Sequence, residues 1–323
     1  MIAVWSAGAP FLPATRLHLD EAGASYSVLA EEPADSDFDR AAGSEVLIVG
    51  GSPVTREVLA RLPRLELLVR AGVGVEKIDI DEATRRGVMV TNVTDYGIQE
   101  VADHSLLLML AAARRLTYFV RQNESDWADA SYLPVGRLSG RTCGLVGLGA
   151  IGSAVAARVT ALGMSVIAHD PWAPAERFAA VTARSVSLTE LLELSDVISL
   201  HVPSTPENRH LLNAEAFGRM RRSPIIVNTA RGALVDTPAL EHALEAGLVS
   251  GAGLDVLDEE PDVSRCVSLL RRDDVVVTPH VAWYSGAARD QLGRTAAEIA
   301  LEFERSGVVP RVLNPEAVRV GRR

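Results

Sequence analysis

Three side chains whose types could together bind a carboxylate and transfer a proton follow predicted strands in the second half of the chain. They are Arg231, Glu260 and His280. Each comes within a few residues of an apolar run that has the length of a buried strand. The runs are 225–228, 251–254 and 275–278. Because the carboxyl ends of parallel strands meet at one edge of a sheet, we expect the three side chains to lie together.

This set of residue types suits the reduction of a 2-keto acid. Arg231 can orient the carboxylate of the substrate in bidentate geometry and polarise the carbonyl. A hydride adds to the keto carbon, and His280 would protonate the oxygen. Glu260 would keep His280 charged beforehand. Taken alone, each residue has a structural alternative. Arg231 could form a surface ion pair, Glu260 could be a loop acid like its neighbour Glu259, and His280 could cap the strand.

The stretch 142–170 predicts the element that supplies the hydride. Gly147, Gly149 and Gly152 have G-x-G-x-x-G spacing, and Asp170 lies near the ~20 residues downstream expected of a ribose-binding acid. The predicted order is strand 143–146, helix 153–162 and strand 166–168. Such glycines permit a tight turn and let the backbone approach a pyrophosphate at the helix N-terminus. The stretch therefore predicts a dinucleotide site.

The end of the second strand also predicts which dinucleotide binds. The charge of Asp170 would repel a 2′-phosphate, and the next residues, Pro171 and Trp172, offer no arginine in its place. We therefore expect NAD rather than NADP. The alternative is that Asp170 is a solvated loop acid.

The bulk composition excludes some other functions. The chain has 323 residues, a net charge of −10 and 48% hydrophobic residues, which fits two globular domains and argues against nucleic acid as the main partner. Cys143 and Cys266 lack zinc-ligand spacing, so we expect no metal; Cys143 is placed in a buried strand and Cys266 in a loop. Neither a signal peptide nor a membrane span is recognised, which predicts a cytoplasmic protein without a membrane partner.

Strands and helices alternate along the whole chain, which predicts parallel sheets covered on both faces. A long helix, 99–116, connects the two halves, and an irregular segment, 118–140, with Trp127, Tyr132 and Pro134 could cover a neighbour or a second subunit. The other expected strands are 2–5, 27–30, 46–49, 67–70, 88–90 and 197–200, and the other expected helices are 15–22, 55–62, 80–86, 188–194, 215–220, 238–246 and 286–306.

Taken together, the motifs resemble the D-isomer-specific 2-hydroxyacid dehydrogenase family over nearly the whole chain. The matching motifs are GLGAIG with Asp170, VNTARG at 227–232, GLDV at 253–256 with Glu260-Pro261, and TPH at 278–280. The resemblance implies that Arg231, Glu260 and His280 are the catalytic set, and it selects Glu260 over Glu259 because the acid of the family directly precedes the proline.

The resemblance also implies the fold and the domain organisation. It implies two doubly wound parallel-sheet α/β domains: a flavodoxin-like substrate domain, 1–98 plus 287–323, and an inserted Rossmann NAD-binding domain, 99–286. It further implies a homodimer that acts on a small 2-keto or 2-hydroxy acid.

Cofactor and substrate contacts follow by the same resemblance. Asp255 and the region of Thr229 would meet the nicotinamide amide. The loop 70–74 would hold the substrate carboxylate through backbone N–H groups. The expected cofactor contacts are Gly147, Gly149, Ala150, Ile151, Gly152, Asp170, Pro171, His201, Pro203, Thr229, Ala230 and Asp255, and the expected substrate contacts are Arg70, Val73, Gly74 and Trp283.

Some positions leave the substrate and the branch of the family open. The segment from His280 to Ser285, with Trp283, is similar to the C-terminal binding proteins, which are NAD-binding corepressors. Trp283 would lie near the substrate side chain, or pack as a residue at the start of a helix. Lys77 departs from the family pattern and, with Arg70, could admit a second acidic group. The alternatives to a keto acid reductase are an NAD-sensing corepressor-like protein and hydride transfer from a donor such as phosphite.

Overall fold

The computed structural model describes residues 1–5, 9–122, 135–258, 260 and 262–320. The segment with Trp127, Tyr132 and Pro134 and the residues Glu259 and Pro261 lie outside the described residues. The chain divides into two compact units, here called unit 1 (Met1–Gly97 with Tyr284–Arg323) and unit 2 (Ile98–Trp283).

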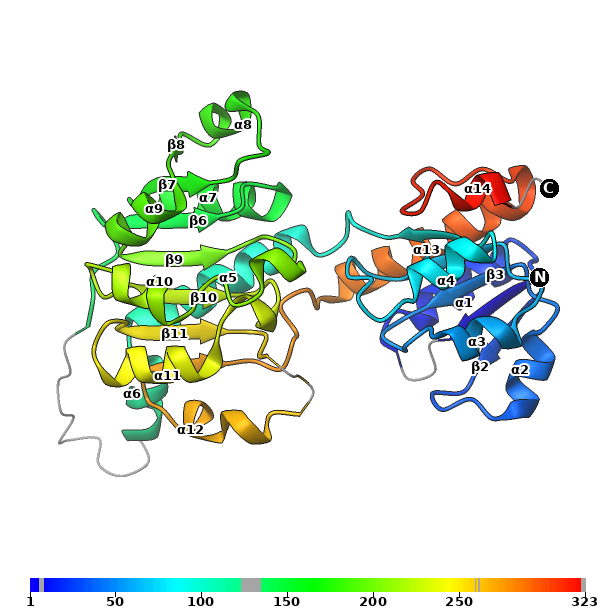
Figure 1. Cartoon of the computed structure of the whole chain (residues 1–323), viewed down its shortest axis with the longest axis horizontal. Helices are drawn as coiled ribbons and strands as arrows, with labels where there is room; N and C mark the ends of the chain where they lie inside the picture. Colours follow the sequence, from blue (N-terminus) through cyan, green and yellow to red (C-terminus); the bar gives the residue numbers. More distant parts are fainter. Residues whose placement is uncertain (6–8, 123–134, 259, 261, 321–323) are drawn as a thin grey trace. The chain divides into compact units, whose positions relative to one another are not determined.

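Unit 1 is built on a parallel sheet with strand order β2-β1-β3-β4-β5 (Figure 1). The strands are β1 Ile2–Trp5, β2 Tyr26–Leu29, β3 Val46–Val49, β4 Leu67–Arg70 and β5 Met89–Asn92. The central strands β1 and β3 are buried throughout, as expected of apolar runs that are covered on both faces. The order 2-1-3-4-5 is the flavodoxin-like order, which confirms the prediction for this part of the chain.

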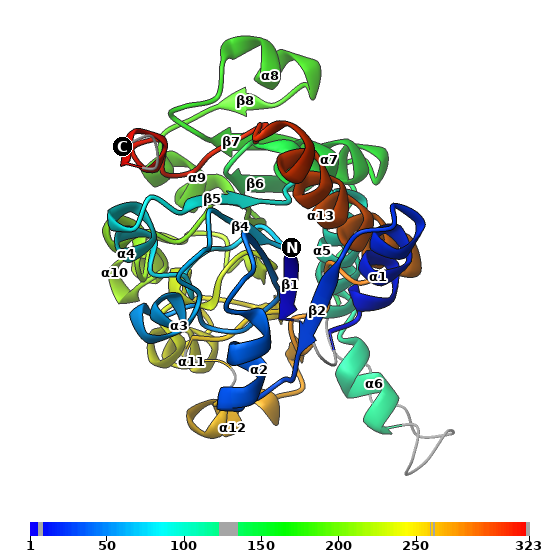
Figure 2. The same ribbon diagram turned by 90° about the vertical axis from the view of Figure 1, so that its right-hand side faces the viewer.

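The C-terminal segment completes unit 1. Helix α13 lies beside α1, and the hydroxyl of Thr15 donates to the carbonyl of Gly293 at 3.2 Å (Figure 2). Beyond α13, the side chain of Asn314 accepts from the backbone N–H of Val90 at 2.8 Å and so binds the tail to β5. The helices of unit 1 are α1 Leu12–Glu21, α2 Asp35–Ala41, α3 Arg56–Arg61, α4 Ile80–Arg85, α13 Gly286–Ser306 and α14 Ala317–Val320.

Unit 2 has a larger parallel sheet with order β12-β11-β10-β9-β6-β7-β8, which Figure 1 shows as a ladder of strands. Numbered within the unit from β6, the order is 3-2-1-4-5-6 with one further strand, which is the Rossmann order. The strands are β6 Thr142–Val146, β7 Ser165–His169, β8 Arg184–Ser185, β9 Val197–Leu200, β10 Ile225–Asn228, β11 Gly251–Leu254 and β12 Val275–Val277. The predicted fold of two doubly wound parallel sheets is thus confirmed.

Helices cover both faces of this sheet. Helices α5 and α7 pack with one buried apolar cluster, and α9, α10 and α11 with the other. The helices are α5 Ile98–Ala113, α6 Leu116–Gln122, α7 Ala150–Ala161, α8 Ala175–Ala180, α9 Leu188–Leu194, α10 Ala214–Arg219, α11 Thr237–Glu245 and α12 Val267–Leu270, with 3-10 turns η1 Pro206–Asn208, η2 Gly232–Leu234 and η3 Ser264–Cys266. Among the described residues, no helix is long and apolar enough to cross a membrane.

Three predictions for unit 2 were wrong in detail. The helix predicted at 99–116 ends at Ala113, and α6 occupies the start of the segment 118–140 that was expected to be irregular; Arg115, between α5 and α6, has a left-handed backbone (φ 54°). Helix α7 begins at Ala150 rather than at Ser153, directly after the glycine turn. Cys266, which was placed in a loop, closes a 3-10 turn and is buried against the core. Cys143 is buried in β6, as predicted.

Candidate active site

The shortest polar contact among the predicted catalytic residues joins His280 to Glu260. The Nδ1 atom of His280 lies 2.5 Å from Oε1 of Glu260. The two residues follow β12 and β11, which are paired neighbours, so their loops leave the same edge of the sheet. His280 and Glu260 keep 47% and 33% side-chain exposure, so the pair is reachable from solvent.

The ionisation of Glu260 depends on its charged neighbours. Burial raises its pKa, but the hydrogen bond and charge of His280, the N–H of Leu257 and the charge of Arg231 act in the opposite sense, and the net pKa is lowered. Glu260 is therefore a carboxylate at neutral pH, and it lies in direct contact with the imidazole of His280.

Arg231 lies next to the same loop, at the carboxyl end of β10. Its carbonyl accepts from the side chain of Asn228 at 2.8 Å, and its guanidinium donates to the carbonyl of Ala230 at 2.7 Å. A Cβ atom on Gly232 would lie 2.0 Å from the carbonyl oxygen of Leu257, so only glycine lets this segment pack against the loop of Glu260. The structure thus brings Arg231, Glu260 and His280 together, and their chemical roles stay predictions.

Asp255 is buried among protein donors. Its carboxylate accepts from the hydroxyl of Thr278 at 2.6 Å and from the backbone N–H groups of Val281 and Ala282, both at 2.9 Å. Its expected contact with the nicotinamide stays a prediction. What the structure shows is that Asp255 holds the segment that carries His280.

Residues of α5 that the sequence did not single out reach the same strand ends. The Nε2 atom of His104 lies 2.8 Å from the hydroxyl of Thr278, and the hydroxyl of Ser105 lies 2.7 Å from that of Thr229. In the sequence, His104 is one of six histidines besides His280, with nothing in the local pattern to mark it.

The glycine turn after β6 fits a dinucleotide. Gly147 has φ 93°, and a Cβ atom there would lie 2.5 Å from the carbonyl oxygen of His201. Gly149 has open space where a Cβ atom would stand and precedes α7 without any side-chain cap. Ala150, Ile151 and Gly152 form the first turn of α7, whose N–H groups suit phosphate oxygens. The residues present therefore fit the cofactor that the motif predicts.

Asp170 stands at the end of β7 and is held by its own loop. One carboxylate oxygen accepts from the N–H of Leu148 at 2.8 Å, and the other from the N–H groups of Trp172 and Ala173 at 3.0 and 3.1 Å. A carboxylate offers about four acceptor positions, so one remains for a ribose hydroxyl. Pro171 and Trp172 follow at the surface.

His201 follows β9 beside the same turn. Its Nε2 atom lies 2.9 Å from the hydroxyl of Ser199, and burial lowers the pKa of its imidazole to about 4. His201 is therefore neutral at physiological pH and adds no charge to the site. Pro203 is exposed, and its carbonyl accepts from the side chain of Asn208 at 2.8 Å.

The predicted substrate loop belongs to unit 1. The Nε atom of Arg70 donates to the carbonyl of Gly74 at 2.9 Å, and its Nη1 atom contacts the carbonyl of Ala71. The side chain of Asn92 donates to the carbonyl of Val73 at 2.7 Å. Arg70 and Asn92 thus shape the loop. Lys77 is exposed beyond it, and Trp283, half-buried, is the last residue of unit 2.

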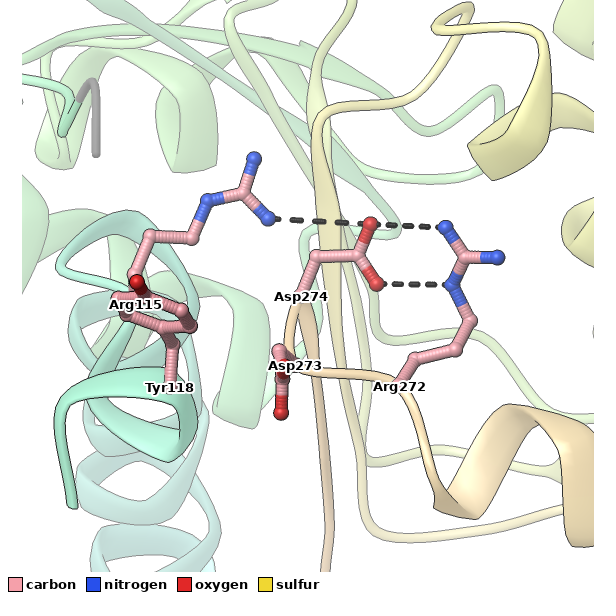
Figure 3. A pocket seen from close by; sticks show the side chains of 5 residues that line it. All are labelled: Arg115, Tyr118, Arg272, Asp273 and Asp274. Atoms are coloured by element: carbon pink, nitrogen blue, oxygen red, sulfur yellow. Dashed lines mark hydrogen bonds and ion pairs between the residues drawn. The ribbon is translucent and has the colours of Figure 1, made fainter. Parts of the chain in front are cut away.

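A separate pocket lies at the other end of the larger sheet, where β12 begins. Its volume is about 330 Å³, and its lining contains none of the predicted site residues (Figure 3). Arg272 contacts the carboxylate of Asp274 through two hydrogen bonds of 2.8 and 2.9 Å, and Arg115 lies 3.8 Å from the same carboxylate. The other lining residues are Tyr118 and Asp273. Because none of the predicted catalytic, cofactor or substrate residues lines it, this pocket is not the candidate active site.

The sequence pattern of one known domain matches the larger unit. Residues 106–282 match the NAD binding domain of the D-isomer specific 2-hydroxyacid dehydrogenases. Among solved structures, the D-lactate dehydrogenase of Aquifex aeolicus, determined with NAD and lactic acid, is similar over 99% of this chain and 98% of its own, with 28% identity and a TM-score of 0.84.

Two curated relatives show higher sequence identity. A glyoxylate reductase of Korarchaeum cryptofilum is 37% identical over 93% of this chain and 90% of its own length. A D-3-phosphoglycerate dehydrogenase of Mycobacterium tuberculosis is 40% identical over 85% of this chain. The match spans only 51% of the length of that mycobacterial relative.

Proposed function

This chain belongs to the D-isomer specific 2-hydroxyacid dehydrogenase family and is an NAD-dependent oxidoreductase, and we propose that it reduces a small 2-keto acid with His280 as the proton donor. The observation that carries the proposal is the 2.5 Å contact between His280 and the carboxylate of Glu260. A carboxylate on Nδ1 orients the imidazole and leaves Nε2 as the atom that can exchange a proton with substrate.

The three catalytic side chains have different tasks in this proposal. The nicotinamide, when bound, supplies the hydride to the keto carbon. His280 donates a proton from Nε2 to the substrate oxygen as negative charge develops on it. Arg231 orients the substrate carboxylate and polarises the carbonyl. Glu260 stays ionised, consistent with its lowered pKa, and stabilises the imidazolium before transfer.

The proposed cofactor contacts are those that the turn after β6 offers. Gly149 and the first turn of α7 hold the pyrophosphate, and Asp170 binds the adenosine ribose through its remaining acceptor position. The other proposed contacts are Gly147, Pro171, His201, Pro203, Thr229, Ala230 and Asp255.

Two observations support the choice of substrate: the loop 70–74 of unit 1 and the activities for which the relatives are named. The backbone N–H groups of Val73 and Gly74 hold the carboxylate, and Arg70 shapes the loop that presents them. Glyoxylate is the first candidate, because a relative that is 37% identical and matched over 90% of its own length is a glyoxylate reductase. Lys77 is exposed just beyond the loop, which leaves room for a second acidic group on the substrate.

The test is a panel of 2-keto acids with NADH and with NADPH, followed by the loss of reduced-cofactor absorbance. The panel holds glyoxylate, pyruvate and the 2-keto form of 3-phosphoglycerate. We expect turnover with NADH. His280→Gln should lower kcat by about 10³-fold while NADH still binds, because an amide cannot transfer the proton. His242→Gln, an exposed histidine of α11, is the matched control. Retention of most of the kcat by His280→Gln would contradict the assignment.

We propose further that two copies of the chain associate and that the protein works in the cytoplasm. The support for the cytoplasm is that both cysteines, Cys143 and Cys266, are free thiols buried in the core. The corepressor-like alternative lacks support, since the relatives named above are a reductase and dehydrogenases.

A further inference from the structure

We propose that His104 is a positioning residue for His280 and acts through Thr278 and Asp255. The proposal rests on the proposed function, because it assigns His104 a part in the same proton transfer. His104 lies on α5, far from His280 in the sequence, and its side chain is only 16% exposed.

The contacts form a chain that ends at one carboxylate. The Nε2 atom of His104 lies 2.8 Å from the hydroxyl oxygen of Thr278, which lies 2.6 Å from Oδ1 of Asp255. His104 and Asp255 are themselves 3.7 Å apart between Nε2 and Oδ1. The hydroxyl of Thr278 is therefore held between an imidazole and a carboxylate.

The direction of the hydrogen bonds follows from the groups present. The carboxylate of Asp255 faces backbone donors and serves as an acceptor. Thr278 has one hydroxyl proton and donates it to Asp255, so its oxygen accepts from His104. The Nε2 atom of His104 must carry the proton. A side chain without a donor at this place would leave the hydroxyl of Thr278 without that bond.

Asp255 connects this chain of bonds to His280. The backbone N–H of His280 donates to the carbonyl of Asp255 at 2.8 Å, while the carboxylate binds the N–H groups of Val281 and Ala282. His280 has φ 55°, a left-handed conformation that persists only where the surrounding contacts determine it. The bonds to Asp255 are those contacts. His104, from the side of α5, holds Asp255 in place through the hydroxyl of Thr278.

The same turn of α5 makes a second contact of this kind. Ser105, the next residue, bonds the hydroxyl of Thr229 after β10. Two consecutive residues of α5 therefore bind side chains at the ends of two different strands. This pairing makes the first turns of α5 a support for the site in addition to their packing in the core.

The test compares variants that keep or remove the donor at this position. His104→Leu removes the donor with little change in volume, whereas His104→Gln places an amide N–H within similar reach. His104→Leu should lower kcat about tenfold through misplacement of His280, with the KM for NADH changed less than about twofold, and His104→Gln should recover most of the loss. His242→Leu, on the exposed face of α11, is the control.

Thr278→Val provides a second route, because it removes the hydroxyl and keeps the branched shape. It should also lower kcat about tenfold, and the double variant with His104→Leu should be no slower than either alone, since both break the same chain of bonds. Thermal unfolding of each variant checks that it folds.

Three results would overturn the proposal. The first is an equal kcat for His104→Leu and His104→Gln, and the second is a kcat of the double variant reduced by the product of the two single effects. The third is a change in the KM for NADH of His104→Leu with kcat unaltered. Each is distinguishable from failure of the proposed function, which would appear as no turnover by the unaltered protein.

Discussion

Asp170 has two roles at the residue scale, because the same carboxylate organises its own loop and is proposed to bind the ribose. Three backbone N–H groups already point at it. Removal of the carboxylate would therefore disturb the loop as well as the binding of the cofactor. A substitution that keeps one acceptor oxygen separates the two effects, because it preserves some of the hydrogen bonds to the loop while it removes the charge.

Asp170→Asn should shift the cofactor preference toward NADPH. The negative charge that repels a 2′-phosphate is lost, so we expect the ratio of kcat/KM for NADPH to that for NADH to rise about tenfold or more. Steady-state kinetics with both cofactors measures the ratio. Asp236→Asn alters a helix-capping carboxylate of α11 and is the control. An unchanged ratio in Asp170→Asn would remove Asp170 as the ribose ligand.

His201 is the residue that should make unfolding sensitive to acid. Its folded pKa of about 4 lies below the ordinary value of 6.5, so between these values the unfolded chain binds more protons. The free energy of unfolding is therefore retained above about pH 6.5 and falls as the pH drops toward 4. The loss is at most about 3 kcal/mol, since the partial exposure of His201 limits it. His201→Asn should flatten this dependence between about pH 7.5 and about pH 5.

Thermal unfolding across that pH range provides the measurement. His242→Asn replaces an exposed histidine and should leave the acid sensitivity as it is in the unaltered protein. If His201→Asn loses as much stability in acid as the unaltered protein does, other groups are responsible for the sensitivity.

At the scale of elements, the turn between β6 and α7 has one position where only glycine fits and another where glycine leaves space for a ligand. Gly147 has a left-handed backbone against the carbonyl of His201, whereas Gly149 has an ordinary φ of −72° and open space beside it. The two glycines of one motif are thus required for different reasons, the first for folding and the second for the approach of the cofactor.

Gly147→Ala and Gly149→Ala should therefore fail in different ways. Gly147→Ala should lower Tm by several degrees, because its Cβ atom would lie 2.5 Å from a backbone oxygen. Gly149→Ala should change Tm much less but weaken NADH binding about tenfold or more, because the added methyl group obstructs the pyrophosphate. Calorimetry and NADH fluorescence titration measure the two quantities.

Gly218→Ala, at an exposed position of α10 with open space beside it, controls for the added methyl group and should change neither quantity for the worse. Normal NADH affinity in Gly149→Ala would contradict the proposed pyrophosphate site.

Strands were predicted better than helices in this chain. β1, β3, β4, β9 and β10 occur over the predicted residues, because a short Val- and Ile-rich run bounded by polar or glycine residues is a local signal. The short helices α2, α8 and α12 were missed. Each has only four to seven residues, and α2 and α8 contain a single large apolar side chain apiece, so no apolar periodicity marks these two helices.

At the scale of the whole molecule, the proposed homodimer has a candidate surface on α5 and α6. Leu107, Leu116 and Val120 are large apolar side chains with 53%, 49% and 58% exposure. An exposed apolar surface is a candidate for burial against a partner, so we propose that these side chains belong to the dimer interface.

Light scattering after gel filtration should give twice the chain mass of 34.5 kDa. Leu107→Glu combined with Val120→Glu should shift the protein to the monomer, because each adds a charge where apolar area would be buried. Leu17→Glu, equally exposed on α1 in unit 1, should leave the dimer intact. A monomer for the unaltered protein at about 10 µM, or a dimer that survives the double substitution, would exclude this interface.

The sequence by itself predicted the two doubly wound sheets, the dinucleotide turn and the grouping of Arg231 and His280 with an acid of the loop after β11. These follow from local signals: strand periodicity, glycine spacing, and the rule that parallel strands end at a common edge. The choice of Glu260 over Glu259 followed from the resemblance to the family. Only the tertiary structure decided which partner each of these side chains has. Asp255 binds the segment after Thr278, and His104 reaches Thr278 across 174 positions of sequence. Such pairings depend on distances between side chains that are set only when the helices pack on the sheet, so the spacing of the residues along the chain does not predict them.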